Sequence, residues 1–147
     1  MVQTVRLDIC IRDHGIGHVD SIKTDVERFD LFALVTFPWE TDRSKAVVYE
    51  FEDRKTVKLG YTARDLAEFL QRQGYSVLVS QWDPVVEYGT QHTWSRFTRF
   101  PADISANNHG NLIAVEPSLL PEVERACRSA PRRLYASRTI ARTFHVN

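Results

Sequence analysis

The alternation of apolar and polar residues along the chain predicts short strands that alternate with short helices. The clearest strand, residues 46–51, is a compact run of β-branched and aromatic side chains. The clearest helix, residues 63–73, has an apolar face, a threonine in position to cap its start and a glycine just after its end. The same reasoning predicts strands over 18–26, 76–82 and 111–115, and helices over 8–14, 29–35 and 121–129.

Strands and helices that alternate at this spacing favour an α/β layer whose sheet has a parallel core. Residues 83–110 stand apart, because the pattern predicts neither a strand nor a helix there. Loops of this length are unusual in a compact domain, and more often than not they have a function. We therefore interpret this aromatic-rich loop as a candidate lid or acceptor-binding segment.

Length and charge predict one domain with a basic end. The chain has 147 residues, of which 43% are hydrophobic, and this is enough for a single core. Its 19 Lys and Arg balance 19 Asp and Glu, so no overall field favours nucleic acid, a membrane or a polyanionic substrate. The last twenty residues contain five arginines and no acidic residue. We expect a domain over 1–130 and a basic tail over 131–147, which we interpret as a solvated terminus before a contact for phosphate or an acidic partner.

The cysteines and the N-terminus predict a cytoplasmic location. Cys10 and Cys127 stand far apart in the sequence, which fits reduced thiols better than a disulfide framework. The N-terminus has no apolar core of a signal peptide, and no run approaches eighteen apolar residues. We therefore expect a protein that is neither secreted nor membrane-spanning.

Two clusters of charged residues follow predicted strands, where ligands of open α/β sheets bind. Lys23, Asp25 and Glu27 alternate along the first strand, so their side chains can share one face. The second cluster is Glu50, Glu52 and Asp53 at the end of the next strand, with Lys55 close by. Carboxylates in these positions can bind ribose or amine groups, act as a base toward a substrate hydroxyl, or ligate a hard metal ion.

Sequence signatures of nucleophilic hydrolysis are absent. The chain contains no G-x-S-x-G, no P-loop, no H-E-x-x-H and no Cys/His pair at a recognisable spacing. His92 and His109 lie in the long loop, where a general base is possible, although a surface histidine without a catalytic role is the favoured interpretation.

Several stretches of the sequence are informative as a set, through their order and spacing. They are Val-Asp-Ser-Ile-Lys-Thr-Asp-Val-Glu-Arg-Phe-Asp-Leu from 19, Phe-Pro-Trp-Glu from 37, Tyr-Glu-Phe-Glu-Asp-Arg-Lys-Thr from 49, Gly-Tyr-Ser-Val-Leu-Val-Ser-Gln-Trp from 74, Tyr-Gly from 88 with His92 and Trp94, and Gly-Asn-Leu-Ile-Ala from 110. In this order and spacing they resemble the second half of FkbM-type S-adenosylmethionine-dependent methyltransferases, over roughly residues 5–117.

The resemblance implies a fold. The family is similar to the doubly wound, class I methyltransferases, whose seven-stranded sheet places S-adenosylmethionine over the carboxyl ends of its first strands and usually ends in an antiparallel hairpin. The expected fold is therefore α/β, a truncated doubly wound sheet with flanking helices. Its strands four to seven would be residues 18–26, 46–51, 76–82 and 111–115.

The resemblance also implies a site. Asp25 and Glu27 match the acidic motif after strand four, which in the family lies beside the cofactor and the acceptor, so both are expected to bind S-adenosylmethionine. Glu50 and Glu52 would line the same crevice after strand five. The expected catalytic residues are Asp25, Glu27, Glu50 and His92, the expected substrate-binding residues are Glu52, Tyr88 and Trp94, and no metal is expected.

The sequence departs from the family in ways that bear on activity. Family members carry a glycine-containing cofactor loop after strand one and an acidic ribose-binding residue after strand two, and this sequence has no counterpart of either. Where the family motif after strand four has glycine, this sequence has Arg28, so a turn with positive φ would cost on the order of 1 kcal/mol there. The resemblance thus implies a C-terminal half, truncated or split, that is inactive alone.

A sheet without strands one to three would leave the strand at 18–26 with an unpaired edge and an exposed apolar face. We expect a complementary N-terminal half or a second copy of the chain to cover that edge; otherwise the chain is a poorly stable remnant. The implied substrate is a small molecule, a sugar, lipid or secondary metabolite whose hydroxyl accepts the methyl group.

Two other functions stay open. The first is a non-enzymatic α/β binding or interaction module derived from the same fold, which would use the aromatic loop or the basic tail for a partner. The second is metal-dependent hydrolysis through Asp25, Glu27, Glu50 and Glu52, for which the sequence places no obvious histidine ligand.

Overall fold

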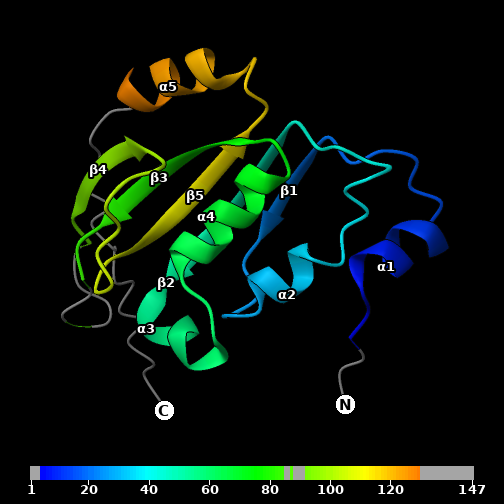
Figure 1. Ribbon diagram of the computed structural model, residues 1–147, viewed down its shortest axis with the longest axis horizontal. Coiled ribbons are helices and arrows are strands. Elements are labelled where there is room, and N and C mark those ends of the chain that lie inside the picture. The colour runs from blue at the N-terminus through cyan, green and yellow to red at the C-terminus, as the bar shows by residue number, and fades with distance from the viewer. Residues whose placement is uncertain (1–3, 85–86, 88–91, 130–147) are drawn as a thin grey trace, which may run out of the picture.

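A five-stranded sheet with strand order β1-β2-β5-β3-β4 forms the centre of the computed structural model, which describes residues 4–84, 87 and 92–129 (Figure 1). The strands are β1 (Ser21–Thr24), β2 (Ala46–Glu52), β3 (Ser76–Trp82), β4 (Trp94–Arg99) and β5 (His109–Val115). The helices are α1 (Leu7–Asp13), α2 (Asp30–Leu34), α3 (Asp53–Thr56), the 3-10 helix η1 (Val57–Leu59), α4 (Ala63–Arg72) and α5 (Leu120–Ser129). These elements confirm the predicted α/β class.

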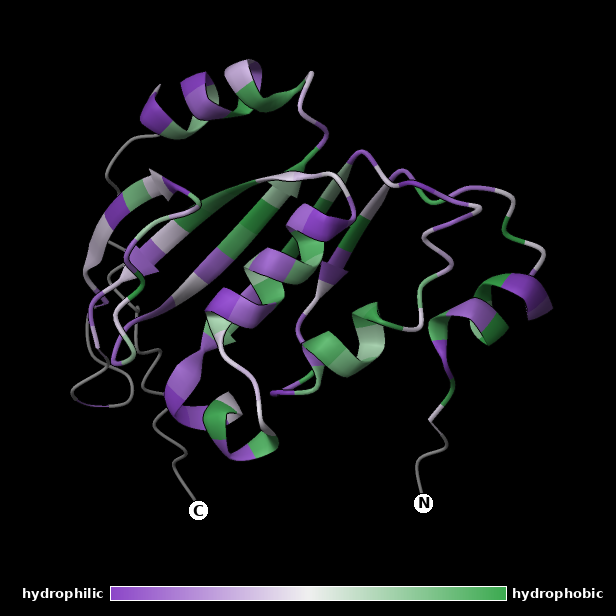
Figure 2. Cartoon of the chain, viewed as in Figure 1, coloured by the Kyte–Doolittle hydropathy of each residue, from purple (hydrophilic) through white to green (hydrophobic). Residues whose placement is uncertain are grey.

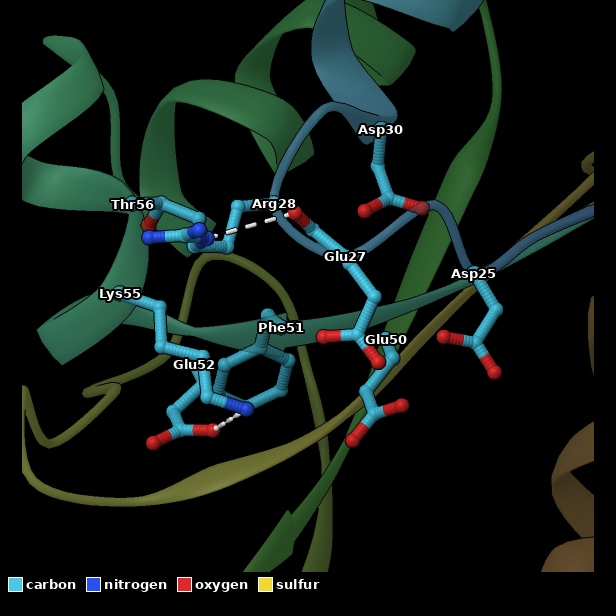
Figure 3. A pocket seen from close by; sticks show the side chains of 9 residues that line it. All are labelled: Asp25, Glu27, Arg28, Asp30, Glu50, Phe51, Glu52, Lys55 and Thr56. Carbon is cyan, nitrogen blue, oxygen red and sulfur yellow. Dashed lines mark hydrogen bonds and ion pairs between the residues drawn. The ribbon is translucent and has the colours of Figure 1, made fainter. Parts of the chain in front are cut away.

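The predicted parallel core is limited to one pair of strands. β1 runs parallel to β2, whereas β5 lies antiparallel between β2 and β3, and β4 pairs antiparallel with β3. Because β1 and β2 are parallel, their carboxyl ends meet at one edge of the sheet, where the side chains of Asp25 and Glu50 come together (Figure 3). The topology thereby creates the place where charged residues were expected to gather.

Residues 83–110 are not one loop, as the pattern predicted, because they contain β4. This strand reads Trp-Ser-Arg-Phe-Thr-Arg and joins β3 across a register shift between Gln81 and Trp82. It lies at the outer edge of the sheet, so it needs no continuous apolar run, and its mixed composition gives no strand signal. The short helix α3 was not predicted either, because its residues are mostly charged and show no apolar pattern.

The core lies between α4 and one face of the sheet, and alternation along the strands explains it. Val47, Tyr49 and Phe51 of β2 are buried in this core, which also holds Leu66 and Leu70 of α4. Figure 2 shows hydrophobic residues along the central strands and alternating hydrophilic and hydrophobic bands on α4.

A smaller cluster packs α5 on the opposite face of the sheet. It is formed by Leu78, Val115 and Leu120, and Leu78 points away from its neighbours Val77 and Val79, which belong to the main core. Helices therefore cover parts of both faces. None of the helices in the described part of the chain is long and apolar enough to cross a bilayer.

Local sequence signals set the limits of α4. The Thr62 side chain accepts a hydrogen bond from the backbone N–H of Asp65, whose carboxylate accepts one from the Thr62 N–H at 2.7 Å. This reciprocal pair confirms the predicted cap at Thr62. Gly74 follows the helix in the left-handed conformation, with φ of 86°, as expected for its end.

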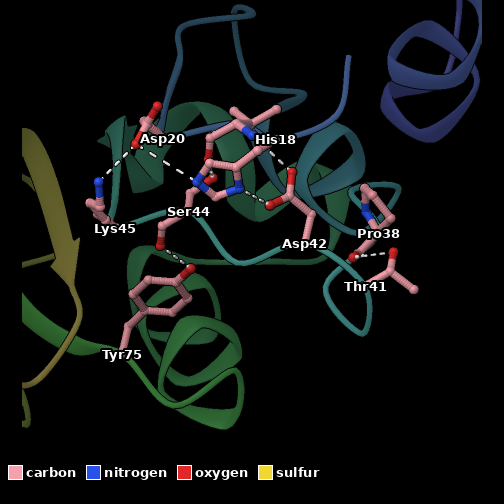
Figure 4. Close-up of polar contacts among 9 residues, drawn as sticks. His18, Asp20, Pro38, Thr41, Asp42, Ser44, Lys45 and Tyr75 are labelled. Carbon is pink, nitrogen blue, oxygen red and sulfur yellow. Dashed lines mark hydrogen bonds and ion pairs between the residues drawn. The ribbon is translucent and has the colours of Figure 1, made fainter. Parts of the chain in front are cut away.

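Side chains from the segment before β2 hold the start of β1 (Figure 4). The Asp42 carboxylate accepts hydrogen bonds from the Val19 N–H at 2.9 Å and from His18 Nδ1 at 2.6 Å. The hydroxyl of Ser44, which is fully buried, donates to the Val19 carbonyl at 2.7 Å. Side chains thus provide hydrogen-bond partners for the backbone N–H and carbonyl of Val19. β1 begins only at Ser21, so the strand is shorter than the predicted 18–26.

We expect Asp42→Ala to lower the free energy of unfolding by about 1–3 kcal/mol, because it leaves the Val19 N–H and the His18 ring without their acceptor. Urea denaturation measures the loss. Asp20→Ala is the matched control: the Asp20 side chain is 70% exposed and forms only surface ion pairs, with Lys45 and His18, so its removal should cost much less than that of Asp42. Equal losses in the two variants would contradict the anchoring role of Asp42.

β1 forms one end of the sheet, and in the described part of the chain only β2 pairs with it. This result agrees with the expected open edge at 18–26. Apolar side chains near this edge are also exposed: the most exposed are Phe29 and Val35, each 51% exposed, and the others are Val26 and Phe32. We call these four residues the apolar patch.

Candidate functional site

A pocket of about 190 Å³ lies where the carboxyl ends of β1 and β2 meet (Figure 3). The turn after β1, the first residue of α2, the end of β2 and the end of α3 supply its walls. The lining residues are Asp25, Glu27, Arg28, Asp30, Glu50, Phe51, Glu52, Lys55 and Thr56. The structure therefore brings together Asp25, Glu27, Glu50 and Glu52, four of the acidic residues that the sequence singled out, whereas Asp53 does not line the pocket.

The turn after β1 has a left-handed backbone at two consecutive residues. Glu27 has φ of 48° and Arg28 has φ of 83°, a region that costs a non-glycine residue roughly 1–2 kcal/mol. The cost at Arg28 was expected only for the case that the turn has positive φ, and the structure shows that it does. Through this turn the Glu27 side chain points toward Glu50 in the pocket (Figure 3).

Acidic groups outnumber basic groups in the pocket, and ion pairs offset only part of the charge. Lys55 Nζ lies 2.7 Å from the Glu52 carboxylate, and Lys23 Nζ lies 3.4 Å from that of Asp25. Burial raises the pKa of Glu50, and the carboxylates of Asp25, Glu27 and Glu52 raise it further, against the opposing charge of Lys55. Glu50 therefore binds a proton more readily than an ordinary glutamate does.

Glu50→Gln is expected to stabilise the fold at neutral pH, because it removes a charge that burial and neighbouring carboxylates disfavour. A raised pKa in the folded state means that stability is greatest below the ordinary value of 4.5 and declines as pH rises through the raised value. The advantage of the variant should therefore vanish below pH 4.5. Chemical denaturation of both proteins across this range measures it.

The control for this prediction is Glu40→Gln, because Glu40 is exposed and does not line the pocket. Its stability relative to the native chain should not change with pH in the same way. A Glu50→Gln variant that is less stable than the native chain at neutral pH would contradict the prediction.

A histidine and aromatic cluster borders the pocket. Glu52 lies directly opposite His109 in the sheet, and His109 lies opposite Trp82. The His92 and His109 rings are 5.6 Å apart, centre to centre, and the Trp82 and His109 rings are stacked at 6.5 Å. Burial and the neighbouring His92 lower the pKa of His109, so its imidazole is neutral at neutral pH.

His92 thus lies beside the pocket but does not line it, and the neighbour that connects it to Glu52 is His109. Trp94 lies on β4, where it pairs with Trp82. Tyr88, the third residue expected to bind substrate, lies outside the described residues, as do residues 131–147.

Sequence reasoning named Lys55 beside the second acidic cluster. It did not place four of the other lining residues in the site: Arg28, Asp30, Phe51 and Thr56. Asp30 is only 4% exposed, and its carboxylate accepts from the Val26 N–H at 3.4 Å. Lys55 and Thr56 belong to α3, which follows β2 directly. Position immediately after a predicted strand was a usable signal for Lys55 and Thr56, but no local pattern marks Asp30 as a pocket residue.

A metal centre finds no support in this site. Among the described residues, no group of three or more His, Cys, Asp and Glu side chains is placed to hold a metal ion. The carboxylates of the pocket therefore give metal-dependent hydrolysis no ligand set in the described part of the chain.

Comparison with known proteins identifies the family. Residues 1–77, just over half of the chain, match the model of the methyltransferase FkbM domain, and the chain belongs to this family. The matched range includes β1, β2 and every residue that lines the pocket, and it ends at the second residue of β3. No curated protein and no solved structure matches the chain.

Proposed function

We propose that the chain is the C-terminal half of an S-adenosylmethionine-dependent methyltransferase that methylates a hydroxyl of a sugar, lipid or secondary metabolite. One observation supports this most: the pocket lies wholly within the range that matches the family, at the carboxyl ends of two parallel strands. On this proposal β1, β2, β3 and β5 are strands four to seven of the doubly wound sheet. The sheet order, with β5 between β2 and β3, is compatible with that assignment.

The pocket fits only part of the cofactor. Its carboxylates suit an ammonium or sulfonium cation and the hydroxyls of a ribose, which need charged or polar acceptors. Its volume of about 190 Å³ is, however, below the roughly 300–1,000 Å³ of pockets that enclose drug-sized ligands. A cofactor that combines an amino acid with a nucleoside therefore needs further walls. We propose that Asp25 and Glu27 contact its polar groups and that the chain does not hold it alone.

The acceptor would enter from the side of the histidine and aromatic cluster. Glu52 joins the pocket to this cluster, and Trp94 and His92 lie on its far side. Glu50 and His92 are the proposed groups for taking up a hydroxyl proton, since Glu50 lines the pocket and the His92 ring lies beside that of His109, which borders it. We also propose a cytoplasmic location, because Cys10 and Cys127 are free thiols.

Calorimetric titration of the chain with S-adenosylmethionine tests the cofactor proposal. We expect no measurable binding, because the pocket can enclose only part of the molecule. Affinity for the isolated chain would refute the proposal that a half-site is missing. If binding is observed, Glu27→Gln should weaken it when the pocket is the binding site. Glu40→Gln, at a residue that does not line the pocket, is the control and should leave binding unchanged.

We propose that a second polypeptide completes the sheet at the open edge of β1, either a complementary N-terminal half or a second copy of the chain. An unpaired strand edge beside exposed apolar side chains is a surface that soluble proteins usually cover. Sedimentation velocity should show self-association or a poorly stable chain. Phe32→Glu in the apolar patch should weaken association, whereas Val57→Glu, at an exposed residue outside the patch, should not. A stable, monodisperse monomer would contradict completion at this edge.

The apolar patch also supports a second candidate function, a binding module without catalytic activity. Phe29, just before α2, and Phe32, on α2, are about half exposed, their rings lie 5.8 Å apart, and neither lines the pocket. A partner that binds the patch while leaving the pocket accessible would favour this function over a split enzyme.

A further inference from the structure

The strained turn that carries Glu27 has an anchor outside its own segment. The hydroxyl of Tyr61, which lies between η1 and α4, donates a hydrogen bond to the carbonyl of Arg28. Tyr61 is only 4% exposed and belongs to the main core, so its hydroxyl occupies a fixed place. The hydrogen bond from Tyr61 therefore connects the turn to the main hydrophobic core.

The same hydroxyl also meets the start of α2. Burial and the charge of Asp30 raise the pKa of Tyr61, and the backbone N–H groups of Leu31 and Asp30, which lie near its oxygen, oppose part of this rise. The residue that precedes α2, Phe29, provides no side-chain cap for this helix. The Tyr61 hydroxyl thus lies between the turn, where it donates to the Arg28 carbonyl, and the first N–H groups of the helix.

A backbone hydrogen bond of 3.2 Å from the Phe29 N–H to the Val26 carbonyl closes the turn, but a right-handed turn can form the same bond, so it does not by itself keep the turn left-handed. Its own side chains contribute a bond of 3.4 Å from Arg28 Nε to the Glu27 carbonyl and one of 3.4 Å from the Val26 N–H to Asp30, both longer than usual. Strained backbone persists where its surroundings over-determine it. In this turn the buried Tyr61 provides that constraint.

We propose that Tyr61 is a positioning residue for the pocket: its hydroxyl holds the turn at Glu27 and Arg28 in the left-handed conformation that directs the Glu27 carboxylate toward Glu50. Loss of the hydroxyl lets the turn relax and withdraws Glu27 from Glu50. The pocket is the site named in the proposed function, but this role of Tyr61 depends only on the geometry of the turn.

The titration of Glu50 reports on the position of Glu27, because Glu27 is one of the three carboxylates that raise the pKa of Glu50. In Tyr61→Phe, NMR of the labelled carboxyl carbon should show the pKa of Glu50 shifted down toward its ordinary value. The other groups that act on Glu50, Asp25, Lys55 and Glu52, do not belong to the turn at Glu27 and Arg28 and should keep their places.

Tyr75→Phe is the matched control. Tyr75 is also 4% exposed, and its hydroxyl also donates to a backbone carbonyl, that of Ser44 at 2.6 Å, but it does not line or border the pocket. This variant should leave the titration of Glu50 unchanged. Equal shifts in the two variants would show a general loosening of the fold and would overturn the proposal.

A second substitution separates positioning from simple destabilisation. Glycine adopts positive φ without strain, so Arg28→Gly should keep the turn left-handed even without its anchor. The double variant Tyr61→Phe with Arg28→Gly should therefore regain the raised pKa of Glu50. Failure of this rescue, or an unchanged Glu50 titration in Tyr61→Phe alone, would overturn the proposal. No cofactor enters these measurements, so their outcome is independent of S-adenosylmethionine binding.

Discussion

Parallel pairing of β1 with β2 is the constraint on which the site depends, because it brings two carboxyl ends to one edge of the sheet. The pairing is short, and the residues before β1 need help from outside the strand. Asp42 and Ser44, on the segment that leads into β2, take up the backbone groups of Val19. β1, which leads into the pocket, is thus flanked by polar contacts before its start and by a strained turn after its end.

The pocket shows a conflict between stability and chemistry. Four carboxylates from the turn after β1 and from β2 line it together, and among the described residues only Lys55 and Lys23 form ion pairs with any of them. Such crowding raises the pKa of Glu50 and favours its protonation, which is a cost for a folded protein at neutral pH. Groups with displaced pKa values are common where proteins bind or transform ligands, and the family membership of the chain agrees with that reading.

The sequence was most informative where local signals agree with one another. α4 begins at its predicted cap and ends near its predicted glycine, because both signals act within a few residues of the helix. At Arg28 the family glycine raised the possibility of positive φ, but only the structure shows that the backbone adopts it. β4 and the pocket residue Asp30 could not be found in this way. A half-exposed edge strand needs no apolar run, and a residue enters a pocket through tertiary packing that no local pattern records.

β5 is the last strand in the described part of the chain, yet it lies in the middle of the sheet and separates β2 from β3. A ribosome that makes this chain therefore releases two apolar strands well before the one that joins them. Until residues 109–115 emerge, the inner edges of β2 and β3 lack their partner, and such edges are prone to pair with other chains. The sheet is therefore complete only after contacts form between distant parts of the sequence.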